Sequence, residues 1–92
     1  MTKPLEVWVV DDDASIRWVL ERALRKASME PRLFDHADAA LAALATRRPD
    51  VLLTDVRMPG TEGLRLLEIA RRDHPGVPVI VMTAHADLDG IR

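Results

Sequence analysis

The sequence lacks cysteine, and among its 92 residues it has only one Phe, two Trp and no Tyr. Without cysteine it can form no disulfide framework, thiolate zinc site or cysteine nucleophile, which fits a reducing compartment. Long apolar runs are also missing, because the longest, residues 39–45, falls far short of the roughly 18 residues of a membrane span. No signal-peptide pattern opens the chain. We therefore expect a cytoplasmic protein without membrane contact.

The sequence also has no excess of positive charge. It contains 13 Lys and Arg residues and 15 Asp and Glu residues, so the formal net charge is −2. Binding to nucleic acid gains its affinity from the release of counterions by a positive surface, so we expect no direct nucleic acid contact by this segment. A chain of this length with 48% apolar residues predicts one small domain with a thin core.

Short apolar runs alternate with amphipathic segments along the chain. The apolar runs predict strands at residues 7–10, 32–34, 51–55 and 79–82. The first, third and fourth have no polar alternation, which is typical of strands buried on both faces, whereas the second follows Pro31 and suits a sheet edge. Helices are predicted at residues 16–27, 37–46 and 63–73, and another could begin within 84–92. This alternation predicts right-handed βαβ crossovers and a doubly wound parallel sheet covered on both faces.

Polar side chains stand where three of the predicted strands end. Asp11 and Asp12 follow the first strand, Asp55 ends the third and Thr83 follows the fourth. Because parallel strands end at one rim, these groups should converge there, and converging carboxylates repel one another unless a cation is bound. Oxygen donors without cysteine favour Mg²⁺. A metal held in this way could leave one carboxylate free to attack a phosphoryl group, with the Thr83 hydroxyl bonding the transferred oxygens.

Each of these residues also has an ordinary structural explanation. An Asp at the head of a helix is commonly its N-cap, although only one residue of the Asp11, Asp12 and Asp13 triplet can cap. A strand-end Asp such as Asp55 also starts turns, and a Thr at the end of a strand, such as Thr83, is by itself common without any function. The convergence of three strand ends at one rim favours a site over these separate explanations.

The same residues match a known family. Asp11-Asp12 after an apolar strand, Asp55 followed by Met58-Pro59-Gly60, and Thr83-Ala84 resemble the phosphoacceptor receiver domain of two-component response regulators. Residues 7–13, 15–24 and 82–89 resemble, more narrowly, the receivers of nitrogen-regulatory activators of sigma-54 transcription. The resemblance implies a flavodoxin-like, CheY-like α/β fold with parallel strand order 2-1-3-4.

The resemblance also implies a role for each matching residue. Asp55 would be the phosphoacceptor, and Asp11, Asp12 and Asp55 would hold Mg²⁺ together with the backbone carbonyl of Arg57. Thr83 would be the switch hydroxyl that follows the phosphoryl group. The partner implied is a sensor histidine kinase. Such a domain is a signalling module and not an enzyme, with at most slow self-dephosphorylation.

The chain departs from the family pattern near its end. Receivers of this family continue into a further helix, a fifth strand ending in a Lys, and a final helix, whereas this sequence stops at Arg92. The only lysines are Lys3 and Lys26, on other segments. We therefore expect a C-terminally incomplete receiver domain over residues 1–92, without the fifth strand and last helix.

Two other functions compete with this interpretation. The spacing Asp11-x-Asp13-x-Ser15 loosely resembles the opening motif of haloacid-dehalogenase enzymes, which would make the protein a Mg²⁺-dependent phosphatase with an aspartyl nucleophile. The other alternative is an interaction fragment without phosphoryl chemistry. It would self-associate through the exposed edge of residues 79–82 or through the segment after Thr83.

Overall fold

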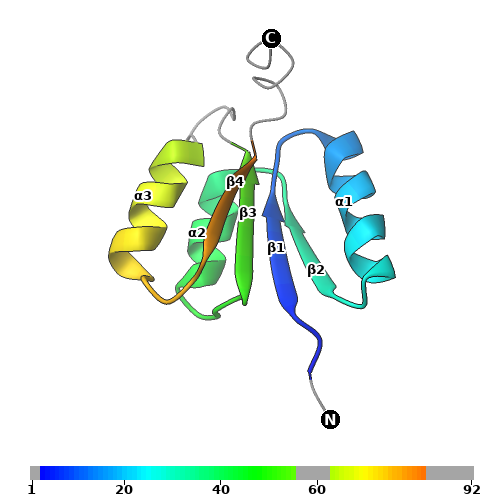
Figure 1. Cartoon of the computed structure of the whole chain (residues 1–92). Helices are drawn as coiled ribbons and strands as arrows, with labels where there is room; N and C mark the ends of the chain where they lie inside the picture. The colour runs from blue at the N-terminus through cyan, green and yellow to red at the C-terminus, as the bar shows by residue number, and fades with distance from the viewer. Residues whose placement is uncertain (1–2, 56–62, 83–92) are drawn as a thin grey trace, which may run out of the picture.

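A computed structural model describes residues 3–55 and 63–82 and gives four strands and three helices there (Figure 1). The predicted elements within the described residues are confirmed, with shifted bounds in four of them. The first strand begins one residue earlier, the first helix begins two residues earlier and ends one earlier, the second strand begins two residues earlier and includes Pro31, and the second helix ends two residues earlier. In chain order the elements are β1 Glu6–Val10, α1 Ala14–Lys26, β2 Glu30–Phe34, α2 Ala37–Leu44, β3 Val51–Asp55, α3 Gly63–Asp73 and β4 Val79–Met82. None of the described helices is long and apolar enough to cross a membrane.

The four strands form one parallel sheet in the order β2-β1-β3-β4, as the sequence predicts. Val10 of β1 lies between Phe34 of β2 and Thr54 of β3, and Asp55 lies beside Met82 of β4. The carboxyl ends of all four strands therefore meet at one rim, at the top of the sheet in Figure 1.

Helices α2 and α3 cover one face of the sheet and pack against each other, whereas α1 lies on the opposite face (Figure 1). The face under α2 and α3 holds the core, because alternate residues of each strand point toward it. Its buried members are Trp8, Val10, Phe34, Ala37, Ala40, Leu44, Leu52, Leu66, Ala70 and Val77.

The face under α1 is covered less completely, and here one prediction is wrong. The sequence predicts β4 as buried on both faces, but its Ile80 is 54% exposed, and Val19 on the apolar face of α1 is 53% exposed. The reason is that α1 packs against β1 and β2, so it covers Val7 and Val9 but leaves the β4 side of this face open among the described residues.

The edge strand β2 accommodates Pro31 without losing a hydrogen bond. The Glu30 amide donates to the Leu5 carbonyl at 2.8 Å, and the Phe34 carbonyl accepts from the Asp11 amide at 3.1 Å. Because backbone groups alternate in direction along a strand, the nitrogen of Pro31 faces away from β1. That outward position needs no N–H group, which is why a proline fits inside this strand.

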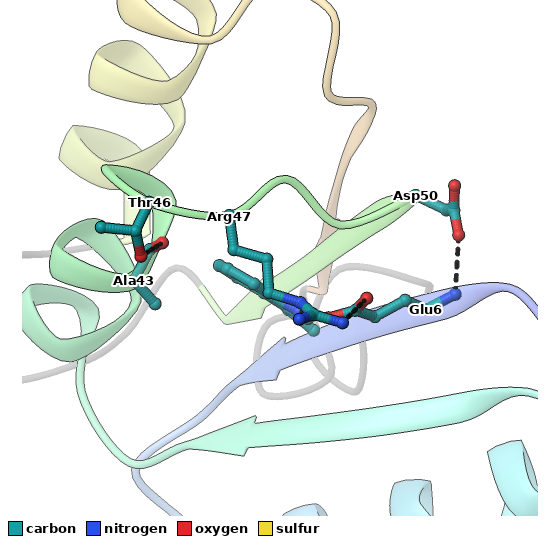
Figure 2. Close-up of polar contacts among 6 residues, drawn as sticks. Glu6, Ala43, Thr46, Arg47 and Asp50 are labelled. Carbon is teal, nitrogen blue, oxygen red and sulfur yellow. Dashed lines mark hydrogen bonds and ion pairs between the residues drawn. The ribbon is translucent and has the colours of Figure 1, made fainter.

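A polar network ties the amino ends of the strands together (Figure 2). The Glu6 amide donates to the Asp50 carboxylate at 2.8 Å, and the Asp50 amide donates to the Glu6 carbonyl at 2.9 Å. The Glu6 carboxylate accepts from the Trp8 indole at 2.7 Å and from Nε and Nη2 of Arg47, each at 2.9 Å. These contacts join β1, β3 and the end of α2 at the pole opposite the carboxyl rim.

Candidate metal centre at the carboxyl rim

Three acidic side chains converge at the carboxyl rim. Asp11 follows the last residue of β1, Asp55 is the last residue of the neighbouring β3, and Asp12 begins the loop toward α1. One carboxylate oxygen from each of the three lies within 4.8 Å of the other two. Asp11 and Asp55 are buried and Asp12 is exposed, so the cluster has a buried base and one side open to solvent.

The electrostatics of this cluster favour a bound cation. Burial raises the pKa of the Asp11 carboxyl, and the charges of Asp55, Asp12 and Asp13 raise it further, while the hydrogen bond from the Asp13 amide at 2.9 Å lowers it in part. Gathering three carboxylates in so small a space is unfavourable without a neutralising charge. Since every donor is an oxygen and one side remains open, the set fits Mg²⁺, which is commonly held by one or two carboxylates while keeping several waters.

Asp13 has a different task from its two acidic neighbours. Its Oδ1 accepts hydrogen bonds from the Ser15 amide at 2.8 Å and the Ile16 amide at 3.3 Å, which makes it the N-cap of α1. The expectation that one residue of the acidic triplet caps the helix is confirmed, and Asp13 is that residue. Asp13 is not a member of the cluster formed by Asp11, Asp12 and Asp55.

Two site residues named from the sequence, Arg57 and Thr83, lie outside the described residues. Their roles as carbonyl ligand and switch hydroxyl stay predictions. The start of a further helix within residues 84–92 also falls outside the described part of the chain.

The sequence pattern missed one residue beside the cluster. Its helical periodicity puts Arg17 on the polar side of α1, opposite the apolar face, whereas in the structure Arg17 is half-buried and its Nη1 donates to the Asp11 carbonyl at 2.7 Å. Its spacing in the sequence was a usable indication. Arg17 comes four residues after the Asp13 cap, so it lies one helical turn further along on the same side of the helix as the acidic loop.

A second missed feature follows β2, the strand whose end showed no obvious chemistry in the sequence. His36 Nδ1 lies 2.6 Å from Asp35 Oδ1 in the loop between β2 and α2. The hydrogen bond with His36 lowers the pKa of Asp35, and the charges of His36 and Arg17 lower it further. The rim therefore carries an Asp–His pair beyond β2, in addition to the three carboxylates that follow β1 and end β3.

Comparison with known proteins adds an independent finding. A sequence model of the family described as response regulator receiver domain matches residues 7–92. The DNA-binding transcriptional regulator NtrC of Salmonella typhimurium is 60% identical over 83 residues, which are 90% of this chain and 18% of that protein. The chain thus spans less than a fifth of the length of the NtrC relatives it matches.

Solved structures agree with this family. The solution structure of the apo receiver domain of nitrogen regulatory protein C is 57% identical, with a TM-score of 0.81, and the match covers 96% of this chain and 71% of that one. The response regulator TrrA of Thermotoga maritima, in complex with Mg(2+)-BeF, is 25% identical with a TM-score of 0.82. That match covers 94% of this chain and 76% of that one.

Proposed function

Because the chain belongs to the response regulator receiver family, we propose that it accepts a phosphoryl group on Asp55 in two-component signalling. The donor is a phosphohistidine of a sensor histidine kinase. An oxygen of the Asp55 carboxylate attacks the phosphorus, the bond from phosphorus to the imidazole nitrogen breaks, and its electron pair leaves with the imidazole. The observation that carries this proposal is the cluster of Asp11, Asp12 and Asp55 within 4.8 Å at the rim.

The other residues of the site prepare Asp55 for this transfer. Asp11 and Asp12 would hold Mg²⁺ together with Asp55, and the backbone carbonyl of Arg57 would be a further ligand. Bound Mg²⁺ would neutralise charge on the transferred oxygens. Thr83 donates its hydroxyl to the phosphoryl group and so carries the signal into the following loop. A Mg(2+)-BeF complex is known for the Thermotoga relative, which supports Mg²⁺ as the metal.

The proposal extends to a longer parent protein. We infer that this domain regulates nitrogen-responsive, sigma-54-dependent transcription in the cytoplasm, since the matched relatives include nitrogen regulators. The formal net charge of −2 supports a role for this segment without direct nucleic acid contact. Sensing and transcription would belong to other chains and domains.

The test is phosphorylation of the protein by a small phosphodonor in the presence of Mg²⁺. Intact mass should increase by one phosphoryl group, and beryllofluoride should shift the amide NMR signals around Asp11 and Asp55. Asp55→Asn should show neither response, because it lacks the attacking oxygen. Asp73→Asn, an exposed carboxyl at the end of α3, is the matched control and should respond like the unaltered protein. Undiminished phosphorylation of Asp55→Asn would overturn the assignment.

A second candidate function is self-association, and β4, which forms one edge of the sheet among the described residues, favours it. Ile80 of this strand is 54% exposed. An apolar edge strand is a template for pairing with another chain. We propose that two copies associate through the edge of β4. The segment after Thr83, the other route expected from the sequence, lies outside the described residues.

A further inference from the structure

Arg17 makes an unusual contact for a charged residue in the first turns of a helix. Its Nη1 donates to the backbone carbonyl of Asp11 at 2.7 Å, and the side chain is half-buried to do so. The carbonyl belongs to the peptide that joins Asp11 to Asp12. Thus a side chain of α1 holds the backbone between two of the three acidic residues.

We propose that Arg17 is a positioning residue of the rim site, which fixes the Asp11–Asp12 peptide and thereby the direction of the Asp12 carboxylate. The part of this inference that concerns Mg²⁺ rests on the proposed function. The part that concerns the loop rests on hydrogen bonds of the described residues alone.

The loop is fastened on both sides of Asp12. Before it, the Asp11 amide donates to the Phe34 carbonyl at 3.1 Å, and after it, the Asp13 amide donates to Asp11 Oδ1 at 2.9 Å. Asp12 itself is exposed. The bond from Arg17 holds the intervening carbonyl, so its loss would leave a buried acceptor unsatisfied and free the peptide to rotate. The direction of the Asp12 side chain depends on that rotation.

Charge and position predict opposite effects on metal binding. If Arg17 acted only through its positive charge, its removal would make the site more negative and strengthen Mg²⁺ binding. If it positions the peptide, its removal weakens binding, because groups that orient metal ligands typically contribute about ten- to hundredfold to affinity. If it served stability alone, Mg²⁺ affinity would stay unchanged while the unfolding free energy fell.

The experiment compares Arg17→Met with Arg22→Met, which removes the same charge from the same helix at an exposed position. Mg²⁺ affinity is measured by calorimetry, without phosphodonor, and exchange of the Asp13 amide hydrogen is measured in metal-free protein. We expect Arg17→Met to bind Mg²⁺ about tenfold or more weakly and to exchange the Asp13 amide faster. Arg22→Met should match the unaltered protein in both.

Three results would overturn the inference: tighter Mg²⁺ binding, unchanged Mg²⁺ binding, or unchanged Asp13 exchange in Arg17→Met. If the unaltered protein binds no Mg²⁺, the proposed metal site is wrong, and the exchange measurement alone decides the role of Arg17 in the loop. If Arg17→Met does not fold, Arg17→Lys decides, since a flexible ammonium holds the carbonyl less rigidly than a guanidinium fork. Mg²⁺ binding should then weaken several-fold, and equal affinity would contradict the proposal.

Discussion

At the scale of single residues, Asp11 combines burial with close like charges. Both raise the pKa of its carboxyl, so the ionised form destabilises the folded protein at neutral pH. Its amide and its Oδ1 nevertheless take part in the hydrogen bonds that shape the loop. The ionised Asp11 carboxylate therefore suits a cation site but lowers the stability of the metal-free protein.

This conflict predicts the effect of Asp11→Asn. The amide keeps an oxygen for the Asp13 N–H but removes one of the three charges, so the free energy of unfolding in metal-free buffer should rise by about 1 kcal/mol. Mg²⁺ should stabilise the unaltered protein in proportion to the logarithm of its concentration and should stabilise the variant far less. Urea unfolding with and without Mg²⁺ measures both effects, and equal stabilisation of the two proteins would argue against Asp11 as a ligand.

The residues of the cluster could be predicted from the sequence, but the contact of Arg17 with the Asp11 carbonyl could not. Asp11, Asp12 and Asp55 stand directly after apolar strands, and parallel strands bring such positions together. The contact of Arg17 depends on the direction that a long side chain takes from its helix. Helical periodicity places Arg17 on a face of the helix, and it does not say that the guanidinium folds back onto a backbone carbonyl.

At the scale of the elements, the start of β1 is held by a contact that depends on charge. The hydrogen bonds from Arg47, with a smaller effect from the Trp8 indole, lower the pKa of Glu6 from 4.5 to about 2. The Glu6 side chain is 18% exposed and that of Arg47 is 59% exposed, so solvent screens part of this interaction. In the network of Figure 2 the Glu6 carboxylate thus links β1 to the end of α2, while the Glu6 backbone and the Asp50 carboxylate link β1 to β3.

The direction of this shift sets a pH dependence. Because the folded pKa lies below the unfolded one, the stabilisation is complete above about pH 5 and is lost as the pH falls from there toward 2. We expect Glu6→Gln to lower the free energy of unfolding by about 1–2 kcal/mol at pH 7, and the difference should shrink at pH 3. The control is Glu21→Gln, whose partner Arg25 is exposed. A difference that does not change with pH would exclude the ionised contact as its cause.

The elements themselves follow closely from the sequence. Continuous apolar runs gave the bounds of β3 and β4, and the Asp13 cap and Gly63 mark the starts of α1 and α3. The strand β2 begins before Pro31 because the proline nitrogen faces outward at an edge, which depends on the strand order of the folded sheet.

At the scale of the whole molecule, the two faces of the sheet differ. Helices α2 and α3 enclose a continuous core, whereas α1 has no fully buried residue and leaves Val19 and Ile80 more than half exposed. The sequence predicted an apolar face for α1 and burial of β4 on both faces, and the second prediction is wrong at Ile80. Its apolar pattern identifies a face without identifying the neighbour that would cover it.

The prediction of self-association rests on the edge of β4 that is exposed among the described residues. Sedimentation velocity should show a concentration-dependent dimer for the unaltered protein. Ile80→Lys should shift the protein toward monomer, because a lysine on an edge strand opposes strand pairing. Because Ile80 is already 54% exposed, the substitution should change the free energy of unfolding little, by about 0.5 kcal/mol. A stable monomer at high concentration would contradict this prediction.

The proline in β2 determines how far such an assembly can grow. Pro31 has no N–H group to donate on the outward side of β2. Strand β2 therefore pairs poorly with the β4 strand of another copy. Head-to-tail contacts between β2 and β4 would build an open filament, whereas β4 paired with β4 closes on a twofold axis. If two copies pair through β4 as proposed, Pro31 would therefore direct strand pairing toward a finite pair and away from fibre growth.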